Sequence, residues 1–263
     1  MTEAQLLEMQ QNDPTPRNAP FNKPTWPYKL GDDLVEPAKF PDQFTQLRNL
    51  YKWYKEQSRK GQSMLGARYT DEDFKKGDGI IWLDFECLYH FYQQSALDVS
   101  VLSLFTLMSV HKCREKGIKE FGFLDPISIN EKTVTEEPKN TEDALYKAML
   151  AYQDKESVLL IYNFRAFGRY RKVCKKHRPF WGDFTVNKYD KCLRQPPSND
   201  HCGFYAMRFM HNYTGDYTSA TDFERVELRT SELLLSDILS LQEELAGFIL
   251  NEVVTEGGKY CVI

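Results

Sequence analysis

The chain lacks the features of a membrane or secreted protein. No apolar run approaches the ~20 residues needed to cross a bilayer, and the N-terminus has no basic-then-apolar signal pattern. The six cysteines show no disulfide-scaffold spacing and are interpreted as reduced thiols. The net charge of −4 gives no global attraction for nucleic acid or anionic lipid. We therefore expect an intracellular protein, nuclear or cytoplasmic, with no membrane partner and with nucleic acid disfavoured.

The composition is that of a globular protein, and the positions of its prolines and glycines predict three segments. Hydrophobic residues make up 41% and aromatic residues 14% of the chain, enough for a real core. Residues 1–40 hold many of the prolines and little periodicity, which predicts a Pro-rich, weakly ordered arm. Residues 41–256 form the expected domain. Residues 257–263, which begin with a Gly-Gly stop, form a tail.

The periodicity predicts many helices and few strands, hence a helix-rich α+β fold. Asp84 and Asp98 are expected helix caps, and the helix that starts near residue 97 should end at Gly117. Residues 77–79 and 121–126 are expected turns, and residues 80–83 a short buried strand or extended piece. Val158–Tyr162 is expected as a central strand. The expected helices cover residues 42–54, 85–92, 97–117, 141–152, 202–213 and 230–254.

A Cys-Gly step opens one of these helices. Cys202-Gly203 follows Gln195-Pro196-Pro197-Ser198-Asn199-Asp200-His201 and precedes apolar residues at helical spacing. A helix N-terminus presents unpaired N–H groups and positive dipole charge, which lower the pKa of a thiol and favour its ionised, nucleophilic form. The same N–H groups, with a Gln donor, can hold the oxyanion of an acyl-transfer intermediate. The pattern indicates a nucleophile at Cys202 and an oxyanion donor at Gln195.

The base that such a nucleophile requires is not evident. A catalytic thiol needs a His that is oriented by an Asp or Asn. His201 adjoins the thiol and should point away from it, and His177 lies in the basic run Lys175–Arg178. His90, His111 and His211 lie in apolar helical contexts. We expect no imidazole within hydrogen-bond reach of Cys202.

Other uses of these residues are weaker. A zinc site is open in principle, but paired metal-ligand spacing is absent from the candidate set of Cys174, His177, Cys192, His201 and Cys202. Arg165–Arg178 carries seven Lys or Arg and no acidic residue, with Phe167 and Tyr170 available for base stacking. A solvated basic face is favoured there because the whole chain is acidic. Four aromatic residues are expected in the core and not in a ligand cage: Trp53, Trp82, Phe180 and Trp181.

Several segments together resemble a known family. The chain resembles the catalytic domain of ubiquitin-like-protein-specific (SUMO-deconjugating) cysteine proteases, in particular the copies encoded by plant transposable elements. The resemblance implies a papain-like fold, with Cys202 matching the nucleophile and Gln195 the oxyanion donor. It implies a ubiquitin-like partner, hydrolysis of peptide or isopeptide bonds after a Gly-Gly tail, and no cofactor. The matching segments are residues 96–102, 121–126, 159–164, 195–211 and 244–250.

The chain departs from this family directly after residue 164. Family members continue from Asn-Phe into a Gly-x-His-Trp step that carries the base, and then into a strand that delivers the orienting Asp. Here Asn163-Phe164 runs into Arg165-Ala166-Phe167, and only 39 residues separate Asn163 from Cys202. We interpret this as an internal deletion around residues 164–166, genuine or from a wrong gene model, that removes the base, the orienting Asp and at least two sheet strands. It predicts an uncovered helix over residues 97–108 and a poorly soluble or molten chain.

Three functional hypotheses follow. The chain is a cysteine peptidase of this class that is impaired because the His and Asp of the triad are missing, a pseudoprotease that binds a ubiquitin-like protein without cutting it, or a truncated product without function. The missing base distinguishes the first two. Closure of the core around the deletion distinguishes the second from the third.

Overall fold

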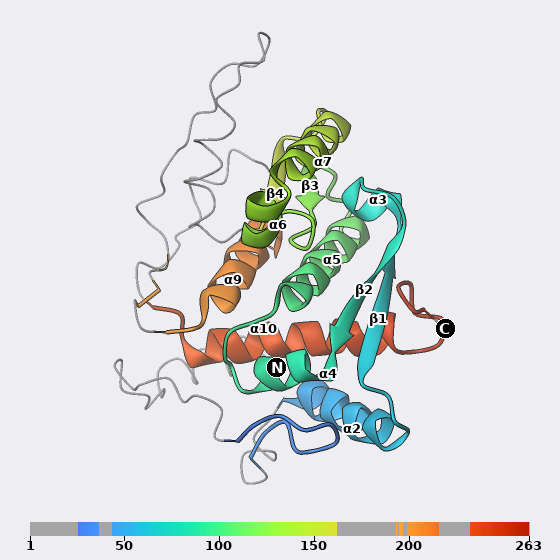
Figure 1. Cartoon of the computed structure of the whole chain (residues 1–263), viewed down its shortest axis with the longest axis vertical. Coiled ribbons are helices and arrows are strands. Elements are labelled where there is room, and N and C mark those ends of the chain that lie inside the picture. Colours follow the sequence, from blue (N-terminus) through green and yellow to red (C-terminus); the bar gives the residue numbers. More distant parts are fainter. Residues whose placement is uncertain are drawn as a thin grey trace.

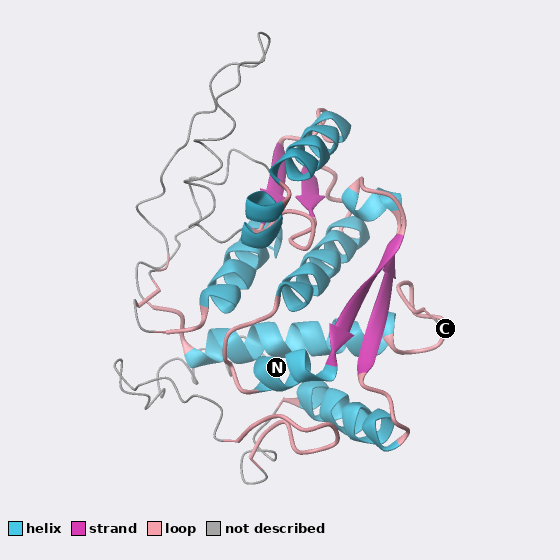
Figure 2. Ribbon diagram, viewed as in Figure 1, coloured by secondary structure: helices cyan, strands magenta, loops and turns pink. Residues whose placement is uncertain are grey.

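The computed structural model describes residues 26–36, 44–161, 193, 195–196, 199–215 and 232–262, and it shows an α+β protein (Figures 1 and 2). The elements in chain order are α2 (Thr45–Arg59), β1 (Met64–Tyr69), α3 (Asp71–Phe74), β2 (Gly79–Asp84), α4 (Phe85–Tyr92), α5 (Val99–Glu115), β3 (Phe121–Leu124), α6 (Glu131–Glu136), α7 (Pro138–Ala151), β4 (Ser157–Leu160), α9 (Cys202–Gly215), α10 (Leu235–Phe248) and the π-helical turn η3 (Ile249–Val253).

The described strands form two separate two-stranded sheets. β1 and β2 are antiparallel, with Leu65 opposite Leu83. The expected strand at residues 80–83 is confirmed, and it alternates: Ile81 and Leu83 are buried while Trp82 is 52% exposed. The expectation of Trp82 in the core was therefore wrong, because it lies on the outward face of the pleat. β1 had no counterpart among the expected elements.

The expectation of a turn at residues 121–126 was wrong. Residues 121–124 form β3, which runs parallel to β4 and is buried along its whole length. Gly122 suggested a turn, but in the structure the absence of a side chain there lets the ring of Tyr152 pack closely against β3. A Cβ there would lie 2.5 Å from the ring of Tyr152. β4 pairs with β3 over Ser157–Leu160, so the strand expected at 158–162 is present at its first residues. Tyr162 and the expected deletion lie outside the described residues.

Local chemistry accounts for several helix boundaries, including both ends of α5. The Asp98 carboxylate accepts a hydrogen bond from the Ser100 N–H at 2.8 Å, which confirms it as the cap of α5. Gly117, with φ of +71°, ends that helix as expected. Asp84 occupies the cap position of α4 without a side-chain cap bond. The start expected at Thr141 was wrong: α7 begins at Pro138, a residue favoured in the first helical turn.

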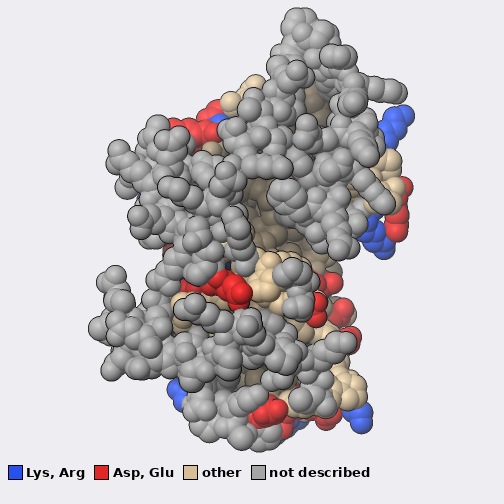
Figure 3. All heavy atoms as spheres, turned by 90° about the vertical axis from the view of Figure 1, so that its left-hand side faces the viewer, with Lys and Arg blue, Asp and Glu red and all other residues tan. Residues whose placement is uncertain are grey.

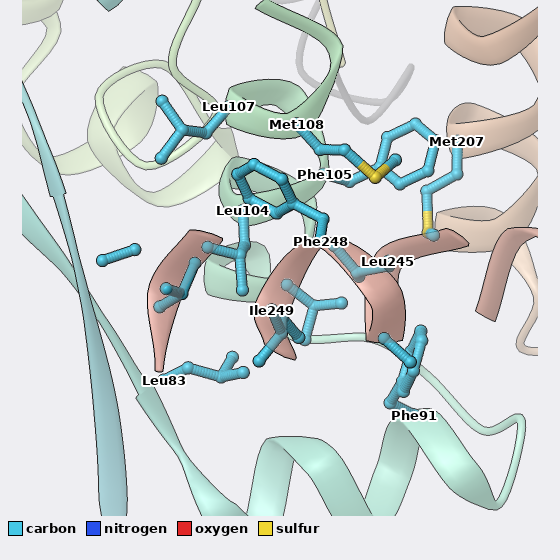
Figure 4. Close-up of a cluster of buried hydrophobic side chains, with 14 of the residues drawn as sticks. Leu83, Phe91, Leu104, Phe105, Leu107, Met108, Met207, Leu245, Phe248 and Ile249 are labelled. Carbon is cyan, nitrogen blue, oxygen red and sulfur yellow. The ribbon is translucent and has the colours of Figure 1, made fainter. Parts of the chain in front are cut away.

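The core is built around α5, which is buried on most of its faces. Leu104, Phe105 and Leu107 are inaccessible to solvent, and α5 packs against α9, α10 and β2. Figure 4 shows how side chains from four helices and η3 gather with Leu83 of β2 in this cluster, among them Phe91, Met108, Met207, Leu245 and Ile249. The expectation of an uncovered helix at residues 97–108 was therefore wrong, because helices α9 and α10 cover it.

Both ends of the described chain pack onto this domain. Leu34 is inaccessible to solvent, and the Tyr54 hydroxyl donates to the Asp32 carbonyl at 3.1 Å. Residues 26–36, which we expected within a weakly ordered arm, are thus part of the fold. At the other end Tyr260 is buried and Cys261 forms a β-bridge with Ala67. The expected tail therefore borders β1 and extends the core.

Exposed charge is mixed. Figure 3 shows Lys or Arg beside Asp or Glu at the margins of one face, and a further group of Asp or Glu near its centre. The basic run Arg165–Arg178 lies outside the described residues, as do Phe180 and Trp181. No helix in the described part of the chain is both long and apolar enough to cross a bilayer.

Candidate active site

A short polar loop sets the start of α9. The Asn199 N–H donates to the Pro196 carbonyl at 3.3 Å, and the Asn199 Oδ1 accepts from the His201 N–H, also at 3.3 Å. The His201 carbonyl then accepts the first helical bond, from the Tyr205 N–H at 3.0 Å. Asn favours such turns because its side chain bonds backbone groups nearby. The expected helix start at Cys202 is confirmed.

Cys202 and its neighbours face in different directions. Cys202 is exposed and is not in a disulfide, whereas His201 is only 2% exposed. Gly203 packs directly against Leu97, in the segment that leads into α5. A Cβ at position 203 would lie 2.9 Å from the Leu97 Cβ. Phe204 is inaccessible to solvent and stacks on Phe91 of α4 with ring centroids 6.3 Å apart. The thiol thus sits in solvent at the end of a helix whose next turn is fixed in the core.

Gln195 belongs to the same loop. Its Nε2 donates to the Asn199 carbonyl at 2.8 Å, and the side chain is exposed. One amide hydrogen is therefore used within the loop, and the other is available to a bound group. The oxyanion role of Gln195 stays a prediction.

The four described histidines are engaged at other places. His211 lies nine residues along α9 from Cys202, about 13.5 Å at 1.5 Å per residue, and pairs with Glu244 at 3.0 Å. His90 Nδ1 lies 2.8 Å from the Ser95 Oγ. His111 lies against the rings of Phe248 and Tyr260. Each of these three described histidines therefore contacts residues other than Cys202. His177 lies outside the described residues.

The fourth histidine, His201, is anchored to the α4–α5 connection. Its side chain hydrogen-bonds the Gln94 backbone, and its ring meets the edge of Phe204 at 5.6 Å between centroids. Burial lowers the pKa of His201 to about 4, although the Gln94 bond and Asp200 act in the opposite direction. The imidazole is therefore neutral at pH 7 and directed into the protein.

A metal centre finds no support among the described residues. No group of three or more His, Cys, Asp or Glu side chains there could hold an ion. Cys174, His177 and Cys192 lie outside the described residues. The two remaining members of the candidate set, His201 and Cys202, face the interior and the solvent respectively.

Comparison with known proteins adds no assignment. No family model, curated protein or solved structure matches the chain. The family named by the 195–211 block therefore remains a prediction from sequence.

We expect stability to fall on mild acidification because of His201. Its folded pKa of about 4 lies below the ordinary value near 6.5, so the unfolded state binds the proton more readily between these values. The stabilisation is complete above pH 6.5 and is lost as the pH falls towards 4, by at most about 3 kcal/mol. Urea titrations at pH 7 and pH 4.5 measure it.

The variant His201→Asn serves as the control for this pH dependence because it cannot be protonated there. In this variant the free energy of unfolding should fall less between pH 6.5 and pH 4.5 than it does in the wild type. Glu244 is not a confounding group in that window. Burial alone would raise its pKa, but His211 and Lys112 together lower it to about 2, so its contribution is lost below pH 4.5. An equal slope in the wild type and in His201→Asn would contradict the assignment.

Proposed function

We propose that the chain is a papain-like member of the ubiquitin-like-protein cysteine peptidase class that binds a ubiquitin-like protein and hydrolyses it poorly. The observation that carries the proposal is the exposed Cys202 at the first residue of α9, directly after the Gln195–His201 loop. This combination of residues and local geometry is the one by which acyl-transfer cysteines are presented.

Binding is favoured over hydrolysis because of the proton that the reaction requires. A thiolate attacks the carbonyl carbon, the C–N bond breaks, and the leaving amine must take up a proton from a general acid. The described histidines have other partners, so none is placed for that step. Loss of one triad member lowers the rate by roughly 10⁴-fold or more in a typical triad enzyme.

A binding module is also favoured over a functionless fragment. The apolar face of α5 is covered by α9 and α10, and each described strand is paired with a neighbour in its own sheet. A chain that had lost its fold would leave such a helix exposed. The closed core around α5 therefore supports a stable partner surface next to Cys202.

The test combines turnover with binding. We expect no measurable release of fluorophore from a SUMO-type protein with a C-terminal fluorogenic amide, and equal binding of the uncleaved SUMO-type protein by wild type and Cys202→Ala. Turnover that disappears in Cys202→Ala would instead establish an active enzyme. His177→Ala would then show whether the base lies in the basic run. Absence of binding to any SUMO-type or ubiquitin-type protein would contradict the binding role.

A further inference from the structure

Three parts of the chain that are far apart in sequence meet behind Cys202. They are the connection between α4 and α5, the first turn of α9, and the middle of α10, which lie close together in Figure 1. The residues at the meeting point are Gln94, His201 and Gln242. None of them belongs to the Cys-Gly motif, and none carries a role in the proposed chemistry.

The α4–α5 connection turns sharply at Gln94. This residue has a φ of +53°, a conformation that non-glycine residues adopt rarely and that surrounding contacts must hold in place. Its side-chain Nε2 donates to the Gln242 Oε1 at 3.2 Å. Gln242 is itself 2% exposed, and its Nε2 donates to the Phe91 carbonyl near the end of α4. Helix α10 thereby fixes the turn.

The fixed turn presents its backbone to the side chain of His201. Because the neutral, buried imidazole is hydrogen-bonded to this fixed turn, His201, the residue before Cys202, is held in one place. The contact between Leu97, three residues after Gln94, and Gly203 fixes the other side of Cys202. Cys202 is thus held through both of its chain neighbours, while its own side chain remains exposed.

We propose that His201 is a positioning residue, which holds the Cys202 thiol in its presented orientation by anchoring the first turn of α9 to the Gln94 turn. The inference deepens the proposed function and rests on it, because it assigns to His201 the support of the candidate nucleophile. Its role is separate from proton transfer. The imidazole faces the interior and bonds backbone, so it acts on Cys202 through the chain.

The first experiment measures hydrogen exchange along α9. In His201→Leu, which fills the space without a donor, amides 205–207 should exchange about tenfold faster or more, while amides 209–214 keep their protection. His201→Asn and His201→Gln each keep a neutral N–H donor, and at least one should restore protection. The matched control is Met210→Ala, a buried position on the same helix about 12 Å from Cys202. Equal loss along the whole helix in His201→Leu, as from a general core defect, would overturn the proposal.

The second experiment measures the reactivity of the Cys202 thiol. The probe is a SUMO-type protein with a C-terminal vinyl methyl ester: the Cys202 sulfur adds to the β-carbon, the C=C π bond breaks, and the α-carbon takes a proton from water. His201→Leu should slow this adduct at least about tenfold, while alkylation by the small reagent iodoacetamide changes less than about threefold, because only the large probe needs an oriented thiol.

The two experiments separate the two proposals. A wild-type protein that neither binds a SUMO-type or ubiquitin-type protein nor gives an adduct with the probe, combined with lost first-turn protection in His201→Leu, defeats the proposed function and leaves the positioning role intact. An equal adduct rate in wild type and His201→Leu defeats the positioning role and leaves the proposed function intact.

Discussion

Replacement of Asp125 by Ala should lower the free energy of unfolding by about 3–5 kcal/mol, because it leaves the Lys76 ammonium without its buried partner. The Asp125 side chain is completely buried. Besides Lys76 it accepts hydrogen bonds from the Ser103 hydroxyl and, at 3.1 Å, from the Ile127 N–H. One carboxylate thus joins α5, the loop after β3 and the segment after α3. Such a loss is a large part of the ~5–15 kcal/mol margin of a domain.

Urea unfolding at pH 7 measures this loss, with three comparisons. Lys76→Met should be similarly destabilising, since it leaves the Asp125 charge buried and unpaired. Asp125→Asn should lose less stability, because its remaining side-chain oxygen can still accept hydrogen bonds from Ser103 and Ile127. Glu56→Ala removes the exposed pair with Lys60 and should not change stability measurably. A loss in Asp125→Ala no larger than that in Glu56→Ala would show that the buried pair contributes nothing.

The elements that sequence predicts correctly are those specified by neighbouring residues. Asp98 marks the start of α5 and Gly117 its end because capping and left-handed backbone are local properties. The start of α9 at Cys202 has the same origin. The strands β1 and β3 were missed because pairing partners decide them. Residues 121–124 are short and contain a glycine, and only β4, more than thirty residues later, makes them a strand.

The same distinction applies to the candidate site. Cys202 and Gln195 stand out in sequence because the chemistry of a thiol at a helix start is readable within ten residues. Asn199 could have been recognised from its turn preference. Gln94 and Gln242 could not, since 148 residues separate them and each is an ordinary polar residue of its own segment. His201 was correctly expected to point away from the thiol, but its anchor is visible only once α4, α9 and α10 are assembled.

The second large effect concerns the C-terminal residues. Tyr260→Ala should lower the free energy of unfolding by about 3–5 kcal/mol, the range for deleting a large buried aromatic side chain. Tyr260 is 2% exposed, and its ring lies 5.5 Å from that of Phe248 and 5.6 Å from that of His111 between centroids. Its carbonyl accepts a hydrogen bond from the Arg68 N–H at 2.8 Å, which ties it to β1.

Two neighbouring substitutions show which part of Tyr260 carries the effect. Tyr260→Phe keeps the ring and its contacts and should retain most of the stability. Lys259→Ala, next to it on the exposed side, should change stability little. Thermal and urea unfolding of the three variants then separate a core residue from a tail residue. If Tyr260→Ala matched Lys259→Ala, residues 257–263 would be the detachable tail that the glycine pair suggested. A loss confined to Tyr260→Ala would place the C-terminal residues in the same cooperative unit as β1, α5 and α10.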